Sequence, residues 1–185
     1  MAGDDPSGGD YQQGRPSGCS LTPDYVAGFV DGEGCFCVSV HPHPTVRYAS
    51  RRWLIAPSFH VYQHGDDVRI LEDLCCYFGC GRVRSKGPRS AVMAFSVYRR
   101  QDLESAIIPF FERYRLRTGK QEDFVKFAES VRLMQSKAHR TEEGFRRIVE
   151  LAFSMNKNGK QRRYRIEEVL TEPSETVRRA LLTKE

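Results

Sequence analysis

Apolar side chains recur at intervals of three and four residues in several stretches of the chain, which predicts amphipathic helices. The first helix follows Thr22, a favourable N-cap, and ends in Asp31-Gly-Glu-Gly34. The second is capped by Asp66 or Asp67 and stopped by Gly79. Further helices are expected from about Asp102 with a disturbance at Pro109, from Phe124 to Val131, and from about Thr141.

Alternating apolar and polar residues between these helices predict strands. The expected strands are Cys35 to about Arg47, Trp53 to His64, Gly81 to Lys86 and Ala91 to Tyr98, the last two joined as a hairpin. The resulting order is αββαββα. It predicts an α+β fold with helices packed on one face of an antiparallel sheet. The core occurs once, so one chain offers half of any twofold site.

The other face of the sheet carries polar side chains. In the third strand Arg82, Arg84 and Lys86 project to one side, opposite the core. The residues assigned to this outer face in the other strands are Cys37, Ser39, His41, Ser58, His60, Tyr62 and Met93. Guanidinium and ammonium groups pair with phosphates or guanine edges, and compact polar groups suit base edges. The face is a candidate nucleic-acid interface, with an ordinary solvated sheet face as the alternative.

Composition is typical of a globular protein. Apolar residues make up 39% and charged residues 29% of the 185 positions, and the formal net charge of +5 is compatible with a nucleic-acid partner. Residues 1–20 predict a disordered leader, followed by one domain over 21–178 and a tail over 179–185. No apolar run suits a membrane span or a secretory signal. The six cysteines lack zinc-ligand spacing. We therefore expect reduced thiols and an intracellular protein, in the cytoplasm, the nucleoid or an organelle.

The first helix carries glycine at positions where an isolated helix would lose stability. Gly28 and Gly32 lie one turn apart, and each costs about 1 kcal/mol relative to alanine. With Ala27, Phe29 and Asp31 they form a face on which another helix could pack closely. This pattern predicts a helix–helix contact.

The same helix ends at a carboxylate. Glu33 lies at the negative end of the helix dipole, between two glycines, where a negative charge is unfavourable. A divalent cation with oxygen ligands would offset this charge. The alternative is an ordinary helix C-terminus with a solvent-exposed glutamate.

The segment Val26-Ala-Gly-Phe-Val-Asp-Gly-Glu-Gly34 resembles the LAGLIDADG motif of homing endonucleases, with Val for the opening Leu and Glu for the usual second Asp. The motif occurs once. Single-motif members of this family, of the type encoded in group I introns, are homodimers in which two such helices pack about the dyad and deliver one acidic residue each. The resemblance therefore implies a homodimer whose interface includes Ala27, Gly28, Phe29, Asp31 and Gly32.

Other segments extend this resemblance. Phe59-His-Val-Tyr-Gln63 resembles the strand whose closing glutamine orients active-site water, and residues 115–121 resemble the segment that supplies an active-site lysine, here Lys120. Residues 154–178 resemble the basic tail of dimeric members. Its candidate phosphate contacts are Lys157, Lys160, Arg162 and Arg163. The family also implies that the sheet is curved and lies along the DNA major groove.

The expected activity is site-specific hydrolysis of double-stranded DNA at a long pseudo-palindromic site. The resemblance implies that Glu33 of each protomer and the Gly32 carbonyl bind Mg²⁺, with Mn²⁺ or Ca²⁺ able to occupy the same sites. Gln63 would position water, and Lys120 would stabilise charge at the scissile phosphate. The alternatives are an intron maturase, which binds intron RNA without cleaving DNA, and a DNA-binding regulator on the same fold.

Overall fold

The computed structural model describes residues 21–42, 53–156 and 162–171. The predicted leader, the predicted tail and the far end of the first predicted strand lie outside the described residues. The strands are β1 (Gly34–Pro42), β2 (Trp53–His64), β3 (Arg82–Ser85) and β4 (Val92–Val97). The α-helices are α1 (Pro23–Glu33), α2 (Val68–Phe78), α3 (Arg100–Asp102), α4 (Ile108–Arg113), α5 (Lys120–Gln135), α6 (Glu142–Ser154) and α7 (Ile166–Thr171).

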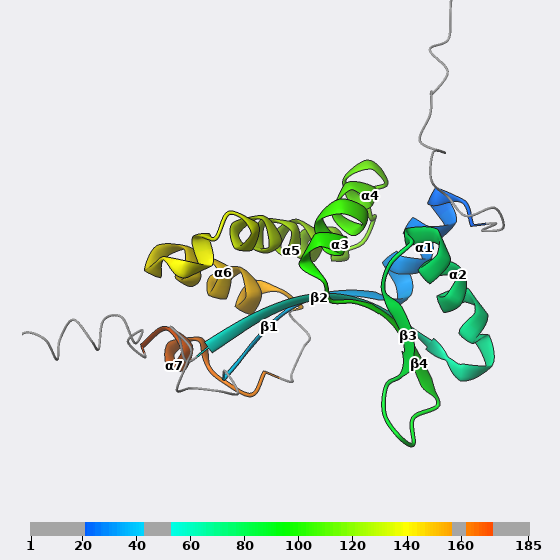
Figure 1. Ribbon diagram of the computed structural model, residues 1–185, viewed down its shortest axis with the longest axis horizontal. Coiled ribbons are helices and arrows are strands. Elements are labelled where there is room, and N and C mark those ends of the chain that lie inside the picture. The colour runs from blue at the N-terminus through cyan, green and yellow to red at the C-terminus, as the bar shows by residue number, and fades with distance from the viewer. Residues whose placement is uncertain (1–20, 43–52, 157–161, 172–185) are drawn as a thin grey trace, which may run out of the picture.

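The strands form one antiparallel sheet in the order β1-β2-β4-β3. Figure 1 shows the sheet as an arch, with α3 to α6 above its upper side and α1 and α2 at its right-hand end. The predicted α+β class, the strand order along the chain and the hairpin of β3 and β4 are confirmed. Among the described residues, no helix is long and apolar enough to cross a membrane.

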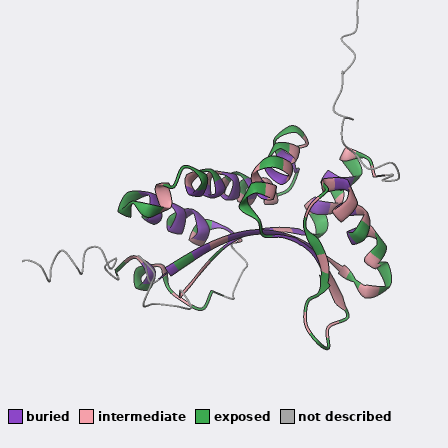
Figure 2. Cartoon of the chain, in the orientation of Figure 1, coloured by how far each residue is buried: buried purple, intermediate pink, exposed green. Residues whose placement is uncertain are grey.

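The hydrophobic core lies between the helices and the upper side of the sheet, where buried residues gather in Figure 2. Phe36 of β1 is fully buried at its centre. Its ring centroid lies 5.1 Å from that of Phe59 on the next strand. It lies 5.3 Å from that of Phe124 and 5.4 Å from that of Phe127, both on α5. This aromatic cluster fixes α5 against β1, the two elements that flank the end of α1.

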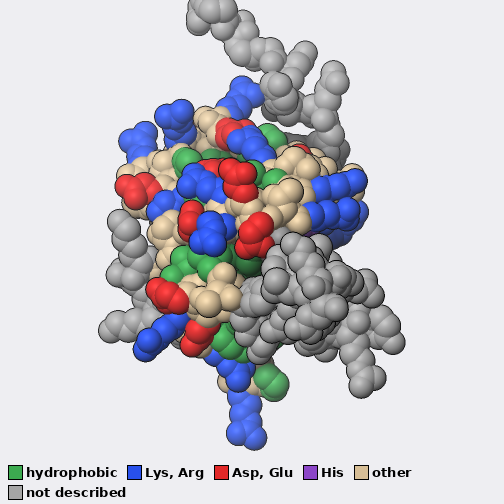
Figure 3. Space-filling model, turned by 90° about the vertical axis from the view of Figure 1, so that its left-hand side faces the viewer, with side chains coloured by type: hydrophobic (Ala, Val, Ile, Leu, Met, Phe, Trp, Pro, Cys, Tyr) green, Lys and Arg blue, Asp and Glu red, His purple; other side chains and the backbone are tan. Residues whose placement is uncertain are grey.

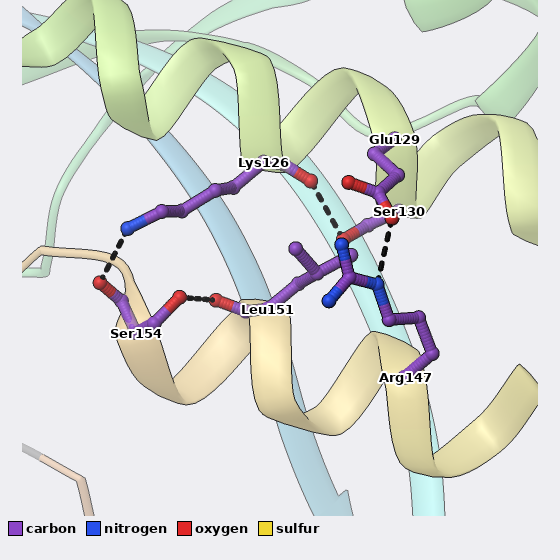
Figure 4. Close-up of polar contacts among 6 residues, drawn as sticks. All are labelled: Lys126, Glu129, Ser130, Arg147, Leu151 and Ser154. Carbon is purple, nitrogen blue, oxygen red and sulfur yellow. Dashed lines mark hydrogen bonds and ion pairs between the residues drawn. The ribbon is translucent and has the colours of Figure 1, made fainter. Parts of the chain in front are cut away.

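Polar contacts fix α6 against α5 (Figure 4). Lys126 of α5 donates from its ammonium to the carbonyl of Ser154 at 3.0 Å, and Arg147 of α6 donates to the Glu129 carboxylate at 2.8 Å. Seen from the end of the molecule where α6 lies, acidic and basic side chains are interspersed over the helices (Figure 3). The helical side of this end therefore has mixed charge.

The first helix forms as its sequence predicts. The Thr22 hydroxyl accepts the N–H of Tyr25 at 3.3 Å, and Pro23 occupies the first turn. The second helix differs at its start. A short 3₁₀ segment, Gly65–Asp67, precedes α2, and the His64 side chain accepts the N–H of Asp66. Asp67 occupies the N-cap position of α2, as one of the two predicted alternatives, but its side chain makes no capping hydrogen bond. The side-chain cap lies one turn earlier, where His64 caps the 3₁₀ segment.

Two regions of the helical layer depart from simple periodicity. Ahead of Pro109, residues Leu103–Ile107 form a π-helical segment between α3 and α4, which accounts for the predicted disturbance. The helix α7 lies within the segment expected to be a basic tail, and the sequence pattern does not predict it. It has a single buried residue, Val169, and its apolar pattern is correspondingly weak.

Candidate acidic site and nucleic-acid interface

The helix α1 ends at the predicted acidic residue. Glu33 is the last helical residue and its side chain is exposed. Gly34 opens β1 directly after it and donates its N–H to the carbonyl of Val30. A Cβ added at Gly34 would lie 2.5 Å from Val30 Cγ1, so a side chain does not fit this turn. The close turn holds Glu33 at a fixed point between α1 and β1.

Lys120 reaches the same helix end from α5. Its ammonium donates to the carbonyl oxygen of Val30 at 2.9 Å and to that of Gly32 at 3.0 Å. Carbonyls in the last turn of a helix carry partial negative charge, which a cation offsets. Burial lowers the pKa of Lys120, while nearby acidic groups, Asp31 foremost, act in the opposite direction. The predicted catalytic lysine and the predicted carbonyl ligand are direct neighbours.

The carboxylate of Asp31 also contacts the segment before α5. Its Oδ2 accepts the N–H of Arg117 at 2.8 Å. Its Oδ1 accepts the hydroxyl of Thr118 at 2.6 Å and the N–H of Thr118 at 3.3 Å. Burial raises the pKa of Asp31, but these hydrogen bonds outweigh burial and leave the pKa below its usual value. Asp31 is thus bound within its own chain.

The remaining face of α1 is open. Apart from the helix's own backbone, no atom of the described residues lies within 4 Å of a Cβ added at Gly28 or Gly32. The rings of Tyr25 and Phe29 stack on the same helix with centroids 6.0 Å apart. Ala27 is buried against its own chain. The predicted packing face is therefore corrected at two positions: Ala27 points inward, and the Asp31 carboxylate contacts the same chain.

Gln63 lies near this site, at the end of β2. Gly34 pairs with Val61 in the sheet register, so the last residues of β2 pass beside the end of α1. The Gln63 side-chain oxygen accepts the N–H of His64 at 2.8 Å. Among the described residues, the amide nitrogen of Gln63 has no hydrogen-bond partner, so it is available to a ligand.

The outer face of the sheet carries most of the residues that were assigned to it. Cys37 of β1 pairs with Ser58 of β2, and directly opposed residues share a face. In β3, Arg82 and Arg84 are exposed, while Val83 packs against the core. The Lys86 ammonium lies 5.0 Å from the centroid of the Tyr62 ring on the same face.

Met93 is the exception. It pairs with Gln63 of β2 and with Ser85 of β3. Phe95, two residues further along β4, is buried against the helices, and Met93 lies on the same side and packs against the core. Its assignment to the outer face is wrong, because the alternation of β4 turns Met93 toward the helices and Ala94 and its even-numbered neighbours outward.

His60 is held in the middle of the outer face. Its Nδ1 lies 2.9 Å from the Ser96 hydroxyl, and its Nε2 lies 2.9 Å from the Ser58 hydroxyl. Its ring stacks with that of Tyr62 and meets that of Tyr98 edge-on. Burial lowers the pKa of His60. Both ring nitrogens are already engaged, so His60 supports the neighbouring tyrosines.

A hollow of about 1070 Å³ lies along β1, the edge strand next to α5. Cys35 and Cys37 line it, with their sulfur atoms 3.1 Å apart. Hydrogen bonding to Cys37 and the nearby Lys120 charge lower the pKa of Cys35 to about 7 despite burial. The same hydrogen bond raises the pKa of Cys37. Both thiols are half-buried on the outer face. Cys35 lies two residues from Cys37 on the same strand, so strand alternation alone predicts that the two share this face.

Of the predicted basic tail, the structure describes residues 154–156 and 162–171. Lys157 and Lys160 lie outside the described residues. Arg162 donates to the carbonyl of Ala152 at the end of α6 and lies 4.5 Å from the Phe153 ring centroid. Arg163 is exposed beside the hollow. Arg162 is thus partly used within the fold, and Arg163 is the freer of the two for phosphate contact.

Sequence reasoning missed the aromatic and hydroxyl groups that complete this surface. Ser96 and Tyr98 of the β4 segment meet His60, and Tyr98 is 57% exposed. The signal was available, because Ser96 and Ala94 alternate with buried Phe95 and Val97. Because His60 of β2 pairs with Ser96 of β4, the register between these strands places Ser96 on the outer face.

Comparison with known proteins agrees with this arrangement. A model of the family described as LAGLIDADG endonuclease matches residues 26–131. The chain is 34% identical over 131 residues to probable intron-encoded endonuclease 2 of Neurospora crassa, a match covering 71% of this chain and 26% of that protein. The chain thus spans about a quarter of the length of this curated relative.

Two solved structures extend the comparison. The crystal structure of the homing endonuclease I-TnaI is similar with a TM-score of 0.72 and 35% identity, covering 82% of this chain and 97% of that one. The structure of I-SmaMI bound to uncleaved DNA target in the presence of calcium ions is similar with a TM-score of 0.68 and 30% identity, covering 88% of this chain and 49% of that one. The family model covers more than half of this chain, including the motif that ends at Glu33, and the chain therefore belongs to the LAGLIDADG endonuclease family.

Proposed function

We propose that the chain is one protomer of a homodimeric, site-specific endonuclease that hydrolyses double-stranded DNA with a divalent metal. The observation that carries this proposal is the end of α1. There an exposed carboxylate, two helix-terminal carbonyls and an ammonium group converge beside a sheet face rich in cations.

The homodimer rests on the open face of α1. Gly28 and Gly32 leave room for close helix contact, and Tyr25 and Phe29 supply apolar area around them. The match covers nearly all of I-TnaI but about half of I-SmaMI, as expected for one half of a twofold arrangement. A second copy would bring a second Glu33 toward the same dyad.

The donor set suits a hard divalent cation. Glu33 offers an exposed carboxylate and Gly32 a backbone carbonyl, the oxygen ligands that Mg²⁺ prefers. The Gly32 carbonyl already accepts a cationic donor, the Lys120 ammonium. Among the described residues, no group of three or more His, Cys, Asp or Glu side chains could hold a metal. Mg²⁺ is usually held by one or two carboxylates together with waters and phosphate oxygens, and a second Glu33 from a partner would supply the second carboxylate.

A bound divalent ion would supply Lewis-acid activation of water and neutralise the leaving oxygen. The chain's own residues have separate tasks. Lys120 would place positive charge near the scissile phosphate, and Gln63 would orient a water through the amide nitrogen left free by its contact with His64. The exposed Arg82, Arg84 and Lys86 would contact the phosphate backbone and base edges.

Cleavage of genomic DNA tests this function. Purified protein is incubated with Mg²⁺ and intron-free host DNA, and new ends are identified by sequencing, with a chelator control. We expect one or a few discrete double-strand breaks that require the metal. Absence of breaks, together with tight binding to intron RNA, would contradict the endonuclease proposal and favour a maturase.

A further inference from the structure

The junction between α1 and α5 is closed by contacts in both directions. Asp31 of α1 binds the 117–118 backbone and the Thr118 hydroxyl. The same hydroxyl accepts the N–H of Lys120, the first residue of α5, at 3.2 Å. The Lys120 ammonium returns to the carbonyls on either side of Asp31. These contacts form a closed hydrogen-bond network between the end of α1 and the start of α5.

We propose that Asp31 and Thr118 are positioning residues that hold Lys120 at the end of α1, where it serves the cleavage reaction. This inference rests on the proposed endonuclease function. A lysine side chain has four rotatable carbon–carbon bonds, so its ammonium is well placed only if its backbone is fixed. Thr118 fixes that backbone through one hydroxyl, and Asp31 fixes Thr118.

This hydrogen-bond network explains why the two acidic residues of the motif have different surroundings. Glu33 is exposed and free to meet a ligand, whereas both oxygens of Asp31 are occupied by donors of the same chain. An interface role for Asp31 would require its carboxylate to point toward a second copy. The contact with Thr118 at 2.6 Å instead directs it toward α5.

A matched pair of substitutions isolates the hydroxyl. Thr118→Val keeps the shape but removes the hydrogen bonds, and Thr118→Ser keeps the hydroxyl. We expect Thr118→Val to lower kcat by about ten- to a hundredfold, the scale of a small misplacement of a catalytic group. KM should change by less than about threefold, since most of the DNA-binding cations lie on the outer face of the sheet. Thr118→Ser should restore most of kcat.

Thr141→Val is the control for simple loss of stability. Thr141 caps α6 through a hydroxyl that accepts the N–H of Gly144 at 3.1 Å, far along the chain from Lys120. The Thr141→Val substitution should lower the urea concentration at the unfolding midpoint, as Thr118→Val does, but it should leave kcat unchanged. An equal fall of kcat in both variants would overturn the positioning role.

A double-mutant cycle supplies the decisive readout. In a Lys120→Met background, measured with excess enzyme over long times, Thr118→Val should cause no further loss if Thr118 acts through Lys120. A full additional loss would overturn the inference.

Sedimentation of Asp31→Asn should show an intact dimer. Monomers whose activity returns at high protein concentration would instead assign Asp31 to the interface. Inactive wild-type protein would overturn the endonuclease proposal itself. Active wild-type protein with equally active variants would instead overturn only the positioning role of Asp31 and Thr118.

Discussion

At the scale of single residues, His60 shows how the outer face is kept rigid. Both ring nitrogens meet serine hydroxyls, one from its own strand and one from β4. The neutral ring suits this arrangement, because a buried imidazolium would lose solvation. A side chain fixed in this way presents its tyrosine neighbours at constant positions.

The pKa of His60 makes stability depend on pH. Burial lowers it from the ordinary value of 6.5. The unfolded chain therefore takes up this proton at a higher pH than the folded chain, and folded-state stability should fall as the pH drops below about 6.5. Urea unfolding near pH 7.5 and pH 5.5 should show a smaller loss in His60→Gln than in wild type. An NMR titration that gives His60 a pKa at or above 6.5 would contradict this account.

At the scale of elements, α6 is constrained at its first turn. A Cβ added at Gly144 would lie 2.1 Å from the backbone oxygen of Ala138, so the preceding 3₁₀ turn, Ala138–Arg140, would have to shift. Gly144→Ala should destabilise the fold by about 1–3 kcal/mol in urea unfolding. Gly119→Ala is the control, since among the described residues nothing beyond its chain neighbours lies within 4 Å of its added Cβ. Equal midpoints for the two variants would refute the close contact.

The helix α1 should behave differently. No other element in the described part of the chain approaches the side-chain position of Gly28, so we expect Gly28→Leu to leave folding intact and instead to obstruct a second copy. Sedimentation should show a larger monomer fraction for Gly28→Leu than for wild type, at unchanged circular dichroism. Gln135→Leu, an equally exposed position on α5, should remain dimeric. A fully dimeric Gly28→Leu protein would show that this face is not the interface.

Periodicity predicted the elements better than it predicted their faces. The bounds of β2 and the stop of α2 at Gly79, which adopts φ +62°, follow from local sequence. The side on which Met93 lies depends on pairing with β2, a long-range relation that local alternation does not contain. The contact of Asp31 with Thr118 spans 87 residues and depends on packing of α5 against β1. The motif could be recognised in sequence, but these contacts required the fold.

At the scale of the whole molecule, charge is distributed unevenly. The formal net charge is +5, and the cations of β3 lie on the outer face while the end of the molecule where α6 lies mixes both signs (Figure 3). This arrangement favours approach of a polyanion from the sheet side.

Salt dependence tests the orientation of the DNA. Arg84→Gln should weaken binding and reduce the slope of log K against log salt by about 1, because one phosphate contact is lost. Arg146→Gln, on the exposed side of α6, should leave the slope unchanged. A reduced slope for Arg146→Gln alone would place the DNA on the helices instead of the sheet.

The measurement that tests the central claim most directly is cleavage of one target duplex with Mg²⁺, and binding of the same duplex with Ca²⁺, by one preparation of Glu33→Gln. Loss of the carboxylate that would hold the metal should lower cleavage by about a hundredfold or more. Binding in the presence of Ca²⁺ should stay within about threefold, because the cations of the outer face remain. Glu150→Gln, exposed on α6, should match wild type in both. Cleavage by Glu33→Gln at the wild-type rate, or binding lost in proportion to cleavage, would contradict the account.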